Sequence, residues 1–235
     1  MIDFHSHFLP RIDDGSDSVE TSLAMLRESR RQGVELIFAT PHFYADEDDP
    51  EDFLRARNRA CERLREAMDE DGGDFPEIRL GAEILFVPGM SVADELIGLG
   101  MDNTPFLLIE PPMMPWRNSM LDEIELTGEN LHRIPVIAHV DRYMRMLRDN
   151  TLFERLADRR MLIQVNADFF LHDSSVMQAL DYLRQRKIHF IGSDCHNLTS
   201  RPPTLGPAAE VIRSDGAEEY LEAINKRIYS FLDRL

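Results

Sequence analysis

Histidines and carboxylates in this chain gather at the carboxyl ends of short apolar runs. Five of the eight histidines hold such a position, and four carboxylates share it. The set comprises His5, His7, Asp14, His42, Glu83, Glu110, His139, Asp194 and His196. Because parallel strands of an α/β barrel direct their carboxyl ends to one mouth, we expect these side chains to converge there. Burying so many ionisable groups is costly unless divalent cations compensate, so the sequence predicts a multinuclear metal site.

The spacing of two pairs adds detail to this prediction. In His5-x-His7, alternate residues of an extended strand point the same way, so both imidazoles can reach one ion. We expect Asp194-x-His196 to repeat that extended geometry and to serve one ion or two neighbouring ions. Nitrogen and oxygen ligands without sulfur suit manganese, iron or zinc.

A different chemistry competes at the last of these runs, "FIGSDCHNLTSR". Cys195 and Arg201 have the Cys-x5-Arg spacing with which a thiolate phosphatase holds a phosphate beside its nucleophile. Such a loop normally needs a glycine to turn tightly, and none lies between the two residues. His196 and Asn197 belong to the metal-type motif instead. We therefore interpret Cys195 as a small core residue, and Arg201 keeps a phosphate-binding role in either chemistry.

Seven apolar or β-branched runs must position these groups: "MIDF", "VELIFAT", "EIRLGAEILF", "PFLLIE", "PVIAHV", "MLIQVN" and "IHFIGS". Their continuous apolar character predicts strands buried on both faces. Helical patterns lie between them, beginning near Asp17, where Glu20 completes a capping box, and recurring over 53–68 and 174–187. This alternation predicts a parallel α/β sheet, either a closed barrel or an open doubly wound sheet. No linker or repeat interrupts it, so we expect a single domain over residues 1–235.

Bulk composition excludes several classes of function. The net charge of −17 and the pI of about 4.8 argue against nucleic-acid binding, which relies on cationic side chains. The opening "MIDFHSHFLP" lacks a secretory signal, and no stretch has the roughly 18 apolar residues of a spanning helix. Two cysteines cannot form a disulfide framework. We expect a cytoplasmic protein that is not itself a membrane protein.

The motifs together resemble the PHP superfamily (polymerase and histidinol phosphatase domain). Within it, the chain is most similar to the capsule-type, manganese-dependent bacterial protein-tyrosine phosphatases. The resemblance rests on "MIDFHSHFLPRIDDG", "ATPH", "GAEI", "LLIEPP", "IAHVDRY", "VNA" and "GSDCHNLTSRPP", which extend from residue 1 to about residue 203. It implies a distorted (β/α)7 barrel with two to three divalent ions, manganese first and iron or zinc as alternatives.

The resemblance also implies a role for each candidate residue. His5, His7, Glu83 and Asp194 would hold one ion. Glu83 would bridge to a second ion, bound also by Glu110 and His139. Asp14, His42 and His196 would hold the third. Arg142 and Arg201 match the phosphate-binding arginines, whereas Arg11 stands where the family usually has glycine.

The implied activity is hydrolysis of a phosphate monoester by metal-bound hydroxide, which attacks phosphorus. The resemblance favours phosphotyrosine on a protein, the tail of a bacterial tyrosine kinase of capsule or exopolysaccharide synthesis and export. The alternative is a small-molecule phosphoesterase of the histidinol-phosphatase type on the same trinuclear site. A scaffold without catalysis would be expected to have a broken ligand set, and all nine positions are filled here.

Two segments and three histidines are left for the structure to place. The acidic stretch 44–53 is expected to be a solvated loop, with a rim that repels acidic substrates or collects metal as the alternative. Trp116 in the 111–116 loop fits burial or exposure, as an anchor for a partner or a substrate ring, equally well. We expect His132 and His172 on the surface and His189 in a packing role.

Overall fold

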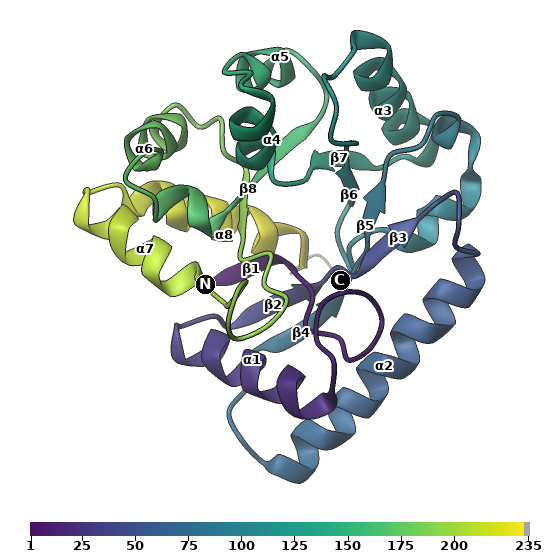
Figure 1. Cartoon of the computed structure of the whole chain (residues 1–235), viewed down its shortest axis with the longest axis vertical. Coiled ribbons are helices and arrows are strands. Elements are labelled where there is room, and N and C mark those ends of the chain that lie inside the picture. Colours follow the sequence, from purple (N-terminus) through teal and green to yellow (C-terminus); the bar gives the residue numbers. More distant parts are fainter. Residues whose placement is uncertain (233–235) are drawn as a thin grey trace.

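The computed structural model describes residues 1–232 of the chain. Strands and helices alternate along it, with the helices arranged around the outside of the strands (Figure 1). All the strand pairs formed by these residues are parallel. The strands are β1 (Ile2–Ser6), β2 (Leu36–Ala39), β3 (His42–Tyr44), β4 (Glu77–Leu80), β5 (Glu83–Leu85), β6 (Phe106–Glu110), β7 (Ile134–Ile137), β8 (Leu162–Asn166) and β9 (Phe190–Gly192).

One of the seven predicted strands is broken in the middle, and another is followed directly by a short additional strand. The second run continues past Pro41 as β3, and the third is interrupted between β4 and β5 at 81–82. Proline has no N–H to give to a ladder, and a Cβ at Gly81 would meet Met101 Sδ at 2.5 Å. The expectation of one continuous strand was therefore wrong for the third run, whereas the second run contains β2 without a break and β3 follows it. Between β2 and β3, and again between β4 and β5, the chain crosses from the sheet β1-β2-β4 to the sheet β3-β5-β6-β7-β8-β9.

The first and last strands meet and close the curled sheet. Ser6 and Cys195 form a parallel bridge, and the His7 amide donates to the Cys195 carbonyl at 2.9 Å. On the N-terminal side of this bridge in both segments, the carboxylate of Asp3 accepts a hydrogen bond of 2.8 Å from the amide of Ser193. When β2 with β3 and β4 with β5 are each counted as one unit, seven strand units follow one another around a distorted barrel.

Helices cover the outside of this barrel (Figure 1). They are α1 (Val19–Arg31), α2 (Pro50–Asp71), α3 (Asn118–Leu131), α4 (Val140–Leu147), α5 (Leu152–Ala157), α6 (Val176–Arg184), α7 (Leu205–Ser214) and α8 (Glu218–Leu232), with short 3₁₀ turns η1 (Met90–Val92), η2 (Asp94–Leu99) and η3 (Ala167–Phe170). The predicted cap of α1 was wrong by one residue, because Ser18 and not Asp17 accepts from the amide of Thr21. Among residues 1–232, no helix has both the length and the apolar composition needed to cross a membrane.

Four fully buried aromatic rings, one from each of four strands, fill part of the interior. Phe4 stacks on Phe190 with 4.0 Å between ring centroids, and it also contacts Phe38 and Phe106. These strands include members of both sheets, so the rings tie the two sheets together. Aromatic contacts of this kind add to the energy of area burial, and they join strands that carry the predicted ligands.

We predict that Gly192→Ala destabilises the fold and disturbs His5. A Cβ at position 192 would lie 2.5 Å from His5 Cβ and 2.9 Å from its amide nitrogen. Overpacking of this kind costs about 1–3 kcal/mol, which urea unfolding would measure. Gly98→Ala is the matched control, because its Cβ would meet only the mobile end of Leu54. Equal stability of the two variants would contradict this account.

Candidate metal centre

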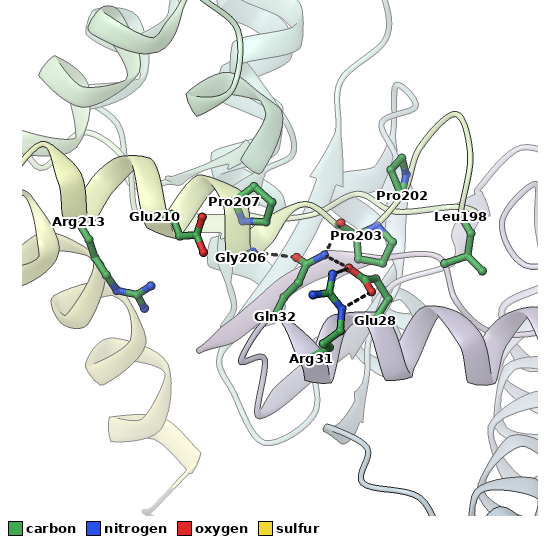
Figure 2. A pocket seen from close by; sticks show the side chains of 10 residues that line it. All are labelled: Glu28, Arg31, Gln32, Leu198, Pro202, Pro203, Gly206, Pro207, Glu210 and Arg213. Atoms are coloured by element: carbon green, nitrogen blue, oxygen red, sulfur yellow. Dashed lines mark hydrogen bonds and ion pairs between the residues drawn. The ribbon is translucent and has the colours of Figure 1, made fainter.

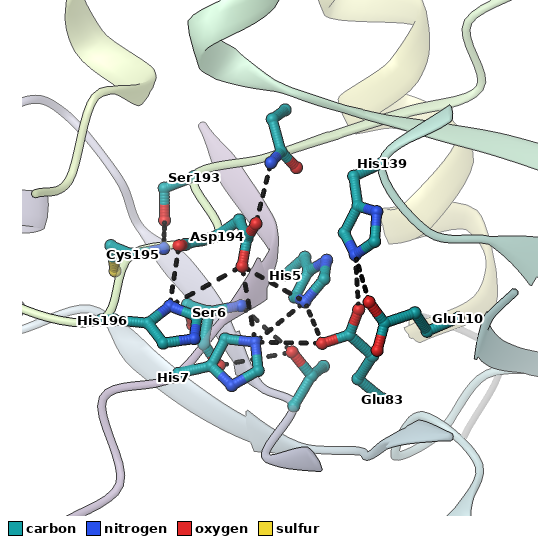
Figure 3. Close-up of polar contacts among 12 residues, drawn as sticks. His5, Ser6, His7, Glu83, Glu110, His139, Ser193, Asp194, Cys195 and His196 are labelled. Carbon is teal, nitrogen blue, oxygen red and sulfur yellow. Dashed lines mark hydrogen bonds and ion pairs between the residues drawn. The ribbon is translucent and has the colours of Figure 1, made fainter. Parts of the chain in front are cut away.

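Glu83 lies at the centre of the predicted cluster and faces four imidazoles. Its Oε2 is 3.0 Å from His5 Nε2 and 3.2 Å from both His7 Nε2 and His42 Nδ1. Its Oε1 is 2.8 Å from His139 Nε2. The break before β5 produces this arrangement, because it pairs Glu83 with His42 of β3 across the ladder. The His5, His7, Glu83 and His139 side chains are all buried at the barrel mouth (Figure 3).

The remaining carboxylates surround this centre. Asp14 Oδ1 lies 3.5 Å from His42 Nε2 and 3.3 Å from His196 Nε2. Glu110 Oε1 is 3.4 Å from His139 Nε2. The structure thus brings all nine predicted positions to one place. Three sets of potential ligand atoms each lie within 4.8 Å of one another: His7, Asp14, His42 and His196; His5, His7 and Glu83; and His42, Glu83 and Glu110.

The donor set fits divalent cations. The Nε2 atoms of His5 and His7 lie only 3.0 Å apart and face the same carboxylate oxygen. Within residues 1–232, the buried His42 Nδ1 and His196 Nε2 have no hydrogen-bond partner, although both face carboxylates. Buried polar atoms are rarely left unpaired in proteins. Converging imidazole and carboxylate groups are the ligands that manganese, iron and zinc accept.

Opposing electrostatic effects act on the imidazoles. Burial lowers the pKa of His7, but hydrogen bonds and charge from Asp13 and Glu83 outweigh it and raise the pKa to about 10. Burial and the neighbouring His7 lower the pKa of His196 to about 4. Burial raises the pKa of Glu83, yet His5 and the other imidazoles hold it well below its ordinary value. A cation binding here must therefore compete with protons on some ligands.

Asp13 orients the ligands and was missed by the sequence analysis, which singled out only its neighbour Asp14. Its Oδ2 lies 2.7 Å from His7 Nδ1 and accepts from the amide of His42 at 3.1 Å. Its Oδ1 accepts from the amide of Gly15. A carboxylate on the far nitrogen of a ligand histidine fixes the ring and raises its basicity. In the sequence, the doubled aspartate of "RIDDG" could have indicated a role for Asp13.

Strand β8 supplies two more supporting residues that were not predicted. The Oε1 of Gln164 accepts from the amide of His139 at 2.7 Å and lies 3.2 Å from His5 Nδ1. The Asn166 amide side chain donates to Asp194 Oδ2 at 2.8 Å, and its backbone donates to Asp141. Two polar residues at alternate positions of the buried run "MLIQVN" were the signal in the sequence.

The two candidate phosphate-binding arginines differ in their contacts. The Nη2 of Arg201 donates to Asp194 Oδ1 at 2.7 Å. The loop that carries Arg201 is held by Asn197, whose Oδ1 accepts from three following amides, and by Gln32, which bridges the loop to α7 (Figure 2). The guanidinium of Arg142 makes no ion pair with any residue in 1–232, and its charge acts on Glu110.

Asp194 departs from the extended geometry predicted for Asp194-x-His196. Strand β9 ends at Gly192, and Asp194 adopts a left-handed conformation with φ 52°. The extended prediction was wrong at this point. The Cys195 sulfur nevertheless points away from the cluster, fully buried (Figure 3). Burial and the nearby Asp3 raise the pKa of this thiol, so Cys195 lacks the thiolate character of a nucleophile.

The structure also places the residues that the sequence left open. Trp116 is buried against Tyr143, whereas Met113 and Met114 of the same loop are exposed. His132 and His172 are exposed, as predicted. His189 Nδ1 accepts from the amide of Ile163, in agreement with its packing role. The acidic stretch 44–53 ends as the first turn of α2 and was only partly a loop.

Comparisons with known proteins agree with this fold. A crystallised metal-dependent tyrosine phosphatase, from a study of YwqE from Bacillus subtilis and CpsB from Streptococcus pneumoniae, superimposes with a TM-score of 0.83 at 24% identity. The match covers 96% of this chain and 92% of that one. The predicted barrel of the PHP type is thereby confirmed.

Sequence comparison defines the family. The family described as "Capsular polysaccharide synthesis, CpsB/CapC" matches residues 1–228, so this chain belongs to it. The tyrosine-protein phosphatase CpsB of Streptococcus pneumoniae is 30% identical over 90% of this chain and 89% of its own length. CpsB of Streptococcus agalactiae is 29% identical over 93% and 92%, and YwqE of Bacillus subtilis is 29% identical over 86% and 79%.

We predict that Asp13→Ala weakens metal binding about 10- to 100-fold without unfolding the protein, because His7 loses the carboxylate that orients it. Calorimetric titration of chelator-stripped protein with Mn²⁺ would measure this loss. Asp46→Ala, in the exposed acidic loop, is the control and should bind as the unmodified protein does. Equal affinity of the two variants would remove Asp13 from the metal centre.

Proposed function

We propose that this protein is a metal-dependent phosphatase that hydrolyses phosphotyrosine on a protein. One observation carries the proposal: eight other nitrogen- and oxygen-bearing side chains gather around Glu83, with two arginines beside them. Membership of the CpsB/CapC family and the names of its tyrosine-phosphatase relatives support the same activity. The thiolate alternative loses its nucleophile, because Cys195 is buried with a raised pKa.

The cation ligands are assigned by proximity and by the resemblance. His5, His7, Glu83 and Asp194 form one site, and Glu83, Glu110 and His139 form a second. Asp14, His42 and His196 form a third. We propose two to three ions, with manganese as the first choice and iron or zinc as alternatives. Such ions supply hydroxide at neutral pH and neutralise phosphoryl oxygens.

The chain's own residues would then orient the ester. Arg142 and Arg201 clamp the phosphoryl oxygens with planar guanidinium groups. Arg142 makes no ion pair within residues 1–232 and is available directly, whereas Arg201 must share or release its bond to Asp194. Asp13, Gln164 and Asn166 hold the ligands in place. The tyrosyl leaving group has a pKa of about 10 and needs only modest assistance.

The substrate follows from the capsule-synthesis family. We propose the phosphotyrosine tail of a bacterial tyrosine kinase in capsule or exopolysaccharide export. The whole chain would act as one domain in the cytoplasm. No observation favours the small-molecule phosphoesterase.

Chelation should abolish hydrolysis of a phosphotyrosyl peptide, and added Mn²⁺ should restore it. Cys195→Ser should keep most of this Mn²⁺-dependent activity, since the thiol does not face the cluster. Release of phosphate from the peptide would be followed with stripped, reloaded and variant proteins. Activity that survives stripping, or that disappears with Cys195→Ser in a folded protein, would restore the thiolate mechanism.

Arg142→Lys and Arg201→Lys should each reduce kcat/KM for the same peptide, because lysine cannot supply two parallel donors. Loss of one charge-assisted hydrogen bond of about 1.5–3 kcal/mol corresponds to at least a tenfold decrease. Arg145→Lys, an exposed position in the same helix as Arg142, is the control. A variant that keeps the kinetics of this control does not belong to the clamp.

A further inference from the structure

Tyr44 extends the wall of the metal centre towards solvent. His42 and Tyr44 occupy alternate positions of β3, so their side chains leave the strand on the same face. Their rings are stacked, with 5.6 Å between centroids and 23° between planes. Tyr44 is 38% exposed, whereas the His42 side chain is 13% exposed. The phenol ring therefore stands between His42 and the opening of the barrel.

The strand register fixes how far Tyr44 lies above the ligands. Tyr44 pairs with Leu85 and Leu85 with Glu110, which forms one row across β3, β5 and β6. His42 and Glu83 pair in the row two residues below. Two residues of a strand advance by about 6.7 Å. An aromatic ring and an aliphatic side chain thus lie one step along the strands from His42 and Glu83, in the row of Glu110, whose side chain is 14% exposed.

The turn after β3 holds Tyr44 in place. Its amide donates to Asp48 Oδ2 at 2.8 Å, and its carbonyl accepts from the amides of Glu47 and Asp48 at 2.9 and 2.8 Å. These bonds fix the backbone of Tyr44, and the stacking on His42 limits where its ring lies before a ligand arrives. Such preorganisation reduces the entropy lost on binding.

We propose that Tyr44 is the platform against which the aromatic ring of an aryl phosphate stacks, and that it makes the site selective for aryl over alkyl esters. The inference rests on the proposed function. When the phosphoryl group is held at the row of His42 and Glu83, the ester group points along β3 and β5 towards the opening of the barrel. A phenyl ring reaches the row of Tyr44, whereas the short methylene of a phosphoserine ends below it. Tyr44 acts as a positioning residue.

Kinetics with two peptides of one sequence, phosphorylated on tyrosine or on serine, test the selectivity. With Mn²⁺-loaded protein, Tyr44→Ala should reduce kcat/KM for the tyrosyl peptide about three- to tenfold, mainly through KM. The seryl peptide should be unaffected, and Tyr44→Phe should behave as the unmodified protein does. Tyr220→Ala is the control, because this tyrosine lies away from the metal centre. It packs beside Arg186 and Ile188, which precede β9, whereas Asp194 of the cluster follows β9. Equal losses on both peptides, or an equal loss with Tyr44→Phe, would overturn the proposal.

Binding of non-hydrolysable ligands separates this proposal from the proposed function. Benzylphosphonate, which has a methylene in place of the ester oxygen, should bind the Mn²⁺-loaded protein more tightly than ethylphosphonate does. Calorimetry should show that Tyr44→Ala loses this preference while Tyr220→Ala keeps it. If both ligands bind and Tyr44→Ala keeps the preference, only the role of Tyr44 is wrong. If neither ligand binds, the phosphate site itself is wrong and Tyr44 has no such role.

Discussion

The buried carboxylate of Glu83 is the constraint on which the rest of the site depends. Four imidazoles face it within 3.2 Å, from strands or strand ends far apart in the sequence. Bringing these groups out of water is unfavourable unless they are mutually compensated or bind cations. The barrel supplies the geometry: the break before β5 sets Glu83 beside His42, and the meeting of β1 with β9 brings His5 and His7 to Asp194. Folding and metal affinity are therefore properties of the same contacts.

Two residues of the cluster have a strained backbone. Asp194 and His139 both have positive φ, at 52° and 32°, a conformation that costs energy in residues other than glycine. Each is held by neighbouring side chains, Asp194 by Asn166 and Arg201, and His139 by the Oε1 of Gln164. The supporting residues thus compensate for backbone geometry that turns the ligands inward.

The gathering of histidines and carboxylates at strand ends was predictable because side-chain type and strand periodicity both carry the signal. His5-x-His7 needs only the two-residue repeat, and the alternation of apolar runs with helical patterns indicates a parallel barrel. The break between β4 and β5 was not predictable in the same way, since it depends on how Gly81 meets Met101. Asp13 and Gln164 act through hydrogen bonds whose partners only the tertiary structure defines. The local conformation of Asp194 depends on its contacts with β1, which no pattern within 190–201 contains.

The closure of the barrel also sets an order of events during protein synthesis. Asp3 and Ser193, which join the first strand to the last, are separated by 190 residues. The earliest ligand histidines leave the ribosome long before the carboxylate and the arginine that complete their surroundings. Contacts between such distant residues form late and slowly. A nascent chain therefore cannot assemble the complete cluster until almost all of it has been made.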